Sequence, residues 1–124
     1  MPHYFTAQEA NATLPVLEPL VERMLDLYQK IVAEQTGVLP AMQKAGGNGG
    51  NRPASQVGMW MGEMEALVQQ IQALGVLVKD TRIGLLDFPA WREGREVYLC
   101  WRYGEKSVAY WHDVDAGFSG RQPL

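Results

Sequence analysis

The chain has 124 residues, of which 47% are hydrophobic and 20% are charged, and its formal net charge at pH 7 is −3. This size and composition are typical of a single globular domain over 1–124. No apolar run approaches the roughly 20 residues of a membrane helix, and no basic cluster favours nucleic acid. The first residues lack the basic and apolar regions of a signal peptide, and a single cysteine cannot form an internal disulfide. We therefore expect a soluble cytoplasmic protein with neither a membrane nor a nucleic-acid partner.

Two prolines complicate the first predicted helix. Thr6 and Glu9 have the spacing of a capping box, which marks a helix start. Pro15 and Pro19 are unfavourable inside a helix but acceptable near its beginning. We therefore predict a short helix, a bend, and a long helix over about 14–37.

A second long helix is predicted over about 55–74, with Gly75 at its C-terminal end. The glycine-rich stretch 45–53 between the helices is the expected tip of a helical hairpin that spans 7–75. It lacks the lysine pattern and the preceding strand of a phosphate-binding loop, so we do not expect it to bind phosphate.

The first helix has more apolar residues than one packing seam requires. Those outside the seam are Leu20, Leu25, Leu27 and Val32. Because outer apolar rows need a partner, they predict self-association, most simply as a two-fold homodimer with a four-helix arrangement. Glu18, Glu22 and Asp26 share another face at a spacing of four, and Lys30 is placed to pair with Asp26. We expect this acidic stripe to be solvated.

The second half of the chain predicts a small antiparallel sheet over 76–112. Residues 76–79 and 84–88 form two short strands, the second ended by Pro89, and 96–113 reads as a hairpin. Eight of the twelve aromatic residues lie in or beside that hairpin, so it forms the second layer of the core. The expected fold is α+β, a long antiparallel helical hairpin packed with a small antiparallel β-meander of four strands.

The turn of this hairpin decides which side chains meet. A two-residue type II′ turn at Gly104-Glu105 pairs Leu99 with Tyr110 and places Cys100 and His112 on opposite faces of the sheet. A three-residue loop with a bulge shifts the pairing by one residue and brings both onto a common face. With the two-residue turn, Cys100 is expected to be a buried, inert thiol opposite Ala109.

Four polar residues follow the hairpin closely, and these are His112, Asp113, Asp115 and Arg121. In a structural reading, Arg121 pairs with Asp113 or Asp87 and clamps an ordered tail, 113–124, onto the sheet. In a functional reading, His112 is a ligand or general base and Arg121 binds a small anion such as a carboxylate or phosphate. Glu105, roughly 20 Å away along the strand, is expected to take no part.

The chain resembles a bacterial family known as domain of unknown function 2203. The resemblance is carried by Phe5-Thr6, Glu9-Ala10-Asn11, Leu14-Pro15, Val78-Lys79-Asp80, Gly84-Leu85, Asp87-Phe88-Pro89, Leu99-Cys100-Trp101, Gly104-Glu105, Trp111-His112, Gly117-Phe118, Gly120-Arg121 and Pro123. The resemblance implies no reaction and no cofactor. It adds only that the polar residues in the C-terminal matching segments are important to the family.

Two functions are therefore compatible with the sequence. In the first, the protein is a non-enzymatic interaction module that self-associates through its helices. In the second, it binds a small ligand or a metal, and is conceivably an enzyme, with a site at His112 and the C-terminal tail.

Overall fold

The computed structural model describes residues 3–36 and 52–124, which form two long helices and a five-stranded antiparallel sheet. The elements are α1 (Ala7–Gln35), α3 (Arg52–Ala73), β1 (Leu77–Asp80), β2 (Leu85–Arg92), β3 (Arg95–Arg102), β4 (Tyr110–Asp113), the 3-10 helix η1 (Phe118–Gly120) and β5 (Gln122–Pro123). Strands lie side by side in chain order. The α+β class and the antiparallel meander are confirmed, with a fifth strand because the tail pairs with β4.

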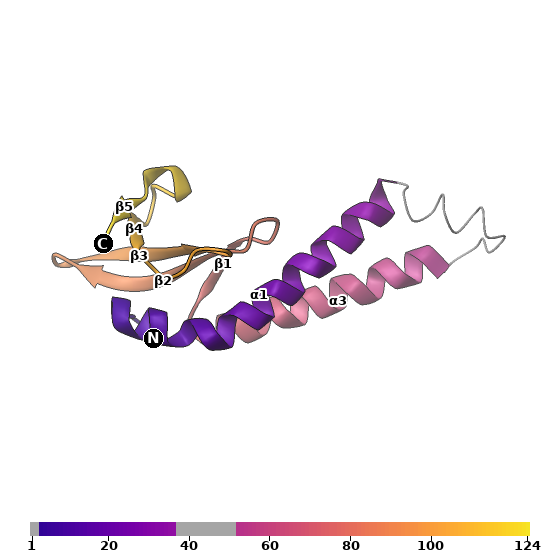
Figure 1. The fold of residues 1–124 in the computed structure, drawn as a ribbon, viewed down its shortest axis with the longest axis horizontal. Coiled ribbons are helices and arrows are strands. Elements are labelled where there is room, and N and C mark those ends of the chain that lie inside the picture. Colours follow the sequence, from indigo (N-terminus) through magenta and orange to yellow (C-terminus); the bar gives the residue numbers. More distant parts are fainter. Residues whose placement is uncertain (1–2, 37–51) are drawn as a thin grey trace.

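Figure 1 shows how these elements are arranged. The first turns of α1 lie along one face of the sheet, and the C-terminal segment lies over the other face. The two helices continue beyond the sheet as a hairpin. The expected helix end at Gly37 and most of the expected tip at 45–53 fall outside the described residues. Within the described ranges, neither helix is both long enough and apolar enough to cross a bilayer.

The helix α1 is continuous, so the prediction of two segments separated by a bend is wrong. Its capping box is present, with the Glu9 N–H donating to the Thr6 hydroxyl at 3.1 Å and the Thr6 N–H donating to the Glu9 carboxylate at 3.0 Å. Both Pro15 and Pro19 lie inside the helix, on its exposed side. Each proline removes one backbone hydrogen bond, and because both prolines lie on the solvent side of the helix, a carbonyl that loses its partner there can be hydrated.

Charged side chains of α1 pair with α3 and with one another, and its apolar side chains pack against the core. Arg23 forms a bidentate ion pair with Glu63 of α3 at 2.6 and 3.0 Å, and Lys30 pairs with Asp26 at 3.3 Å as predicted. Glu18, Glu22 and Asp26 are exposed, which confirms the solvated stripe. The assignment of Leu27 to an outer apolar row is wrong because its side chain is fully buried. Leu20 and Leu25 also pack against the core.

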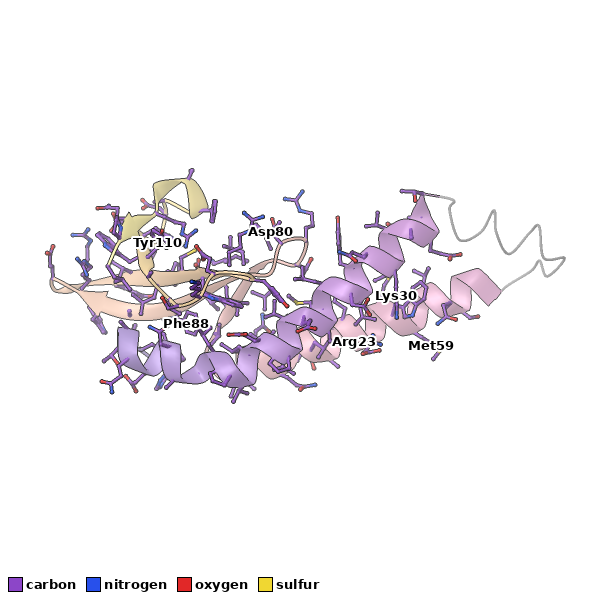
Figure 2. The ribbon with its side chains drawn as sticks, viewed as in Figure 1. Arg23, Lys30, Met59, Asp80, Phe88 and Tyr110 are labelled. Carbon is purple, nitrogen blue, oxygen red and sulfur yellow. The ribbon has the colours of Figure 1, made fainter. Side chains whose placement is uncertain are left out.

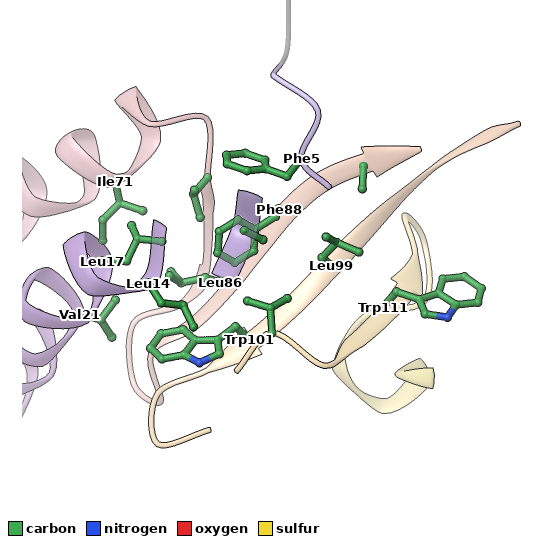
Figure 3. Packing of buried hydrophobic residues seen from close by; sticks show 14 of the residues in the cluster. Phe5, Leu14, Leu17, Val21, Ile71, Leu86, Phe88, Leu99, Trp101 and Trp111 are labelled. Atoms are coloured by element: carbon green, nitrogen blue, oxygen red, sulfur yellow. The ribbon is translucent and has the colours of Figure 1, made fainter. Parts of the chain in front are cut away.

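The core lies between α1 and the inner face of the sheet (Figure 3). Leu17 and Val21 of α1 meet Leu86, Phe88 and Trp101 of the two central strands, and all five are at most 1% exposed. Burying side chains of this size contributes about 1.5–3 kcal/mol each, which explains why α1 tolerates two prolines. The predicted second core layer is confirmed.

The β3–β4 register differs by one residue from the expected one. Tyr98 pairs with His112 and Cys100 pairs with Tyr110. The connection is a seven-residue segment, 103–109, instead of a two-residue turn. It is held by the Trp101 indole N–H donating to the Glu105 carbonyl at 3.1 Å and by the Asn11 side chain bonded to both backbone groups of Val108. Cys100 and His112 therefore share one face of the sheet.

The strand β2 passes through Pro89, which was expected to end it. Pro89 lies beyond the end of β1, and its carbonyl accepts the Phe5 N–H at 2.7 Å. The backbone nitrogen and carbonyl of Pro89 point to the same side of β2, toward the N-terminal segment and away from β3. The missing N–H of proline therefore removes no hydrogen bond to β3. The turn to β3 uses Glu93 and Gly94, both with positive φ, as in a type I′ hairpin.

Candidate functional site

Three buried polar side chains meet on the outer face of the sheet. Asp87 lies opposite Cys100 across β2 and β3, and His112 lies on β4 two residues beyond Tyr110, the cross-strand partner of Cys100. Because side chains alternate, all three point away from the face that carries Phe88 and Trp101. Their ligand atoms lie within 4.8 Å of one another. Asp87 is 2% exposed, Cys100 0% and His112 2%, so the cluster is shielded from solvent.

The hydrogen bonds of His112 determine where its protons lie. Nδ1 is 2.7 Å from the backbone carbonyl oxygen of Asp113, and since a carbonyl only accepts, Nδ1 carries a hydrogen. Nε2 is 3.0 Å from each carboxylate oxygen of Asp87. A neutral ring protonated on Nδ1 points the Nε2 lone pair at that carboxylate. The contact is attractive only when a proton or another cation lies between the two groups.

The Cys100 thiol completes the cluster in its protonated form. Burial, reinforced by the Asp87 carboxylate, raises the pKa of the Cys100 thiol to about 12, although Arg121 acts in the opposite direction. A nucleophilic cysteine needs a lowered pKa and a free imidazole nitrogen as its base. Both nitrogens of His112 are engaged elsewhere, so this geometry does not support a thiol nucleophile. The expected burial of Cys100 is confirmed, but its neighbours are Asp87 and Tyr110 instead of Ala109.

The C-terminal tail lies beside this cluster. Arg121 donates from Nη2 to both carboxylate oxygens of Glu105, at 2.8 and 2.7 Å. Its guanidinium carbon also lies 4.0 Å from the centre of the Tyr110 ring and 4.7 Å from that of Phe118. Figure 2 shows Tyr110 beneath the C-terminal segment. Since Tyr110 is the cross-strand neighbour of Cys100, this stack borders the cluster.

The structure brings only one of the four predicted site residues into the cluster. His112 is in the cluster. Asp113 contributes its carbonyl to His112, while its carboxylate accepts from Arg95 at 2.8 Å. The predicted pairing of Arg121 with Asp113 or Asp87 is wrong, because Arg121 binds Glu105, which was expected to lie far from the predicted site residues. Asp115 is exposed.

Two residues of the cluster were not assigned to a common site from the sequence. Asp87 entered only as a possible partner of Arg121, and Cys100 was expected on the opposite face. The β3–β4 register is the feature that would have identified Asp87 and Cys100 as members of the cluster. The sequence allowed the observed one-residue shift of this register as an alternative to the two-residue turn. Asp87 and Cys100 have no characteristic spacing because they come from different strands.

The donor set of the cluster suits a transition metal. Thiolate sulfur, imidazole nitrogen and carboxylate oxygen are the three ligand types that zinc uses, at about 2.0–2.3 Å. Such bonds place ligand atoms about 3–4 Å apart, so the cluster needs to contract by only about one ångström. The Asp113 carbonyl fixes the His112 tautomer so that Nε2 is available, as outer partners of metal-binding histidines do.

Comparisons with known proteins give a family but no activity. Neither the curated proteins nor the solved structures contain a match to this chain. Residues 3–124 match the family described as Uncharacterized conserved protein (DUF2203). Because this match covers nearly the whole chain, the chain belongs to that family.

Proposed function

We propose that this protein binds a divalent transition-metal cation of the zinc class through Asp87, Cys100 and His112. The observation that carries the proposal is the contact between His112 Nε2 and both oxygens of Asp87 at 3.0 Å, with Nδ1 already committed to a carbonyl. Two buried acceptors that face each other need a proton or a metal cation between them, so the contact is a position that a cation can occupy. A thiol adjoins this contact as a third ligand.

Charge balance favours a divalent ion. Without metal, an imidazolium, a carboxylate and a neutral thiol sum to zero. With metal, a divalent cation, a neutral imidazole, a carboxylate and a thiolate also sum to zero. The cation therefore replaces two protons and leaves the buried site without a net charge. An uncompensated net charge would be the main energetic obstacle to burying an ion there. Three protein ligands leave one position of a tetrahedral ion for a water or a substrate atom.

A titration of chelator-treated protein with zinc and cobalt tests the proposal. We expect one ion per chain, and for cobalt a near-ultraviolet absorption from the thiolate. Asp87→Asn, Cys100→Ser and His112→Gln should each weaken binding at least tenfold. Asp115→Asn is the matched control, because it removes an exposed carboxylate from the adjoining segment. Wild-type protein that binds neither ion, or Cys100→Ser that binds cobalt as wild type does, contradicts the proposal.

A second candidate function is self-association through the outer side of α3. Met59 is 71% exposed and Met61 53%, and a side chain added at Gly58 or Gly62 would meet nothing within 4 Å. Figure 2 shows Met59 pointing away from α1. Exposed apolar side chains beside bare backbone suit close packing of a second helix, and a second copy supplies one by two-fold symmetry.

Sedimentation at micromolar concentration tests this candidate. A dimer that dissociates in a Met59→Lys, Met61→Lys double variant supports it. The control is the Gln8→Lys, Gln29→Lys double variant, because it adds the same two charges at exposed positions of α1. A wild-type monomer of 13.9 kDa contradicts self-association.

A further inference from the structure

The buried cluster raises the question of how a cation would reach it. All three ligand residues are at most 2% exposed, and α1 with the core closes the inner face of the sheet. The C-terminal tail follows β4 directly and lies over the outer face of the sheet (Figure 1). Arg121 stacks on Tyr110, the cross-strand neighbour of Cys100, and this contact places the Arg121–Glu105 pair beside the cluster.

The tail is attached to the sheet through few backbone contacts. The strand β5 has two residues and the 3-10 helix η1 has three. Leu124 adds one bond to the loop after β3, with its N–H donating to the Ala109 carbonyl at 2.9 Å. Short edge pairing of this kind is the part of a structure that opens most readily.

One side-chain contact dominates the attachment. Arg121 donates from its single Nη2 group to both carboxylate oxygens of Glu105, and its side chain is only 12% exposed. It also stacks on Tyr110 and Phe118. A charge-assisted pair with this little exposure is much stronger than a solvated one. Glu105 belongs to the loop after β3, so the pair joins the tail to an element that the core holds in place.

The beginning of the tail is linked to the cluster itself. The Asp113 carbonyl accepts both the Nδ1–H of His112 at 2.7 Å and the N–H of Ala116 at 3.0 Å. Gly117 then has φ of +74° and ψ of −169°, a conformation open essentially to glycine alone. A turn and a glycine thus separate the ligand His112 from the movable part of the tail.

We propose that residues 114–124 form a strap over the Asp87–Cys100–His112 site, that the Arg121–Glu105 pair is its latch, and that the strap opens to admit and release the cation. The inference rests on the proposed metal-binding function. It makes Arg121 and Glu105 residues that control the rate of exchange instead of ligands. It also gives a role to the contact of Arg121, which was expected to bind a small anion, with a carboxylate of the protein itself.

Labelling of the single cysteine measures strap opening without any metal. In chelator-treated protein we compare the rate at which iodoacetamide modifies Cys100 in wild type, Glu105→Gln and Arg121→Gln. Both latch variants should react at least tenfold faster, and cobalt should associate faster in the same proportion. Arg23→Gln is the matched control, since it breaks a bidentate Arg–Glu pair that lies between the helices. Its labelling rate should stay within twofold of wild type.

Global unfolding is separated from strap opening by urea. In wild type, labelling through the strap should depend only weakly on low urea concentrations, whereas labelling through global unfolding rises as steeply as the unfolding equilibrium itself. Wild-type labelling with the full urea dependence of unfolding, or latch variants that react at the wild-type rate, overturns the strap. Faster labelling of the latch variants without metal binding by wild type refutes the proposed function and leaves the mobile strap in place. Tight metal binding by wild type, with latch variants labelled at the wild-type rate, supports the proposed function and refutes the strap.

Discussion

At the scale of single residues, Cys100 links the fold to pH. The fold raises the pKa of its thiol from an ordinary value of 9.0 to about 12, with burial as the largest cause and Asp87 next. The folded chain therefore holds the thiol proton at pH values where the unfolded chain has lost it. This contribution to stability is complete below about pH 9 and is lost as the pH rises toward 12, by about 1.4 kcal/mol per pH unit.

We therefore predict that metal-free protein loses stability above pH 9 more steeply than Cys100→Ala does. Urea unfolding at pH 7, 9 and 10 in the presence of a chelator measures the difference. At pH 7 the variant should be less stable than wild type, because it leaves a small cavity. The gap should narrow by about 1 kcal/mol between pH 9 and pH 10. Parallel pH dependences in both proteins would show that the thiol is not the titrating group.

At the scale of secondary-structure elements, the connection between β1 and β2 depends on a glycine. Gly84 has φ of +67°, and a side chain there would lie 2.7 Å from Val21 Cγ1 and 2.9 Å from Tyr103 Cβ. The backbone thus approaches α1 more closely than any other residue allows. The absence of a side chain at Gly84 therefore determines how closely the sheet packs against α1.

Replacing Gly84 by Ala should destabilise the fold by about 2–4 kcal/mol, because conformational strain and a clash with the core add together. Gly94→Ala is the matched control, with φ of +81° but nothing within 4 Å of the added methyl group. It should lower stability by only about 1 kcal/mol. Denaturant unfolding of both variants gives the comparison. Equal losses would mean that the approach of Gly84 to α1 contributes nothing.

Local signals predict elements well when the determining groups are close in sequence. The Thr6–Glu9 capping box and the glycine at position 75, with φ of +87°, lie where the sequence places them. The β3–β4 register does not follow from local signals, because Asn11 of α1 holds the loop at Val108 from 97 positions away. The prolines of α1 mislead for the same reason, since packing against the sheet outweighs local preference.

The candidate site could be predicted only in part, because it also depends on contacts between residues far apart in the sequence. His112 was identified because it stands among polar residues at the end of a strand. Asp87 and Cys100 join it only through strand pairing, and a shift of one residue moves a whole strand to the other face. Arg121 was expected to pair with an aspartate, but the folded loop brings Glu105 within 2.7 Å.

At the scale of the whole molecule, the proposed metal site on the outer sheet face would join β2, β3 and β4 in one cross-link. An ion that binds only the folded chain stabilises it by about 2.7 kcal/mol when its concentration is one hundred times the dissociation constant. For a domain of 124 residues this corresponds to a rise in melting temperature of about 10 °C. The proteins to compare are wild type and His112→Gln, with and without zinc.

The size of this rise should depend on pH in a defined direction. Binding displaces the thiol proton and the proton between His112 and Asp87, so protons compete with the cation. Stabilisation by zinc should therefore increase from pH 6 to pH 8, while His112→Gln should show little stabilisation at either pH. Calorimetric titration in buffers of different ionisation enthalpy should find about two protons released per ion at pH 7. Release of no protons would exclude thiolate ligation by Cys100 and reduce the cluster to a structural ion pair beside a thiol.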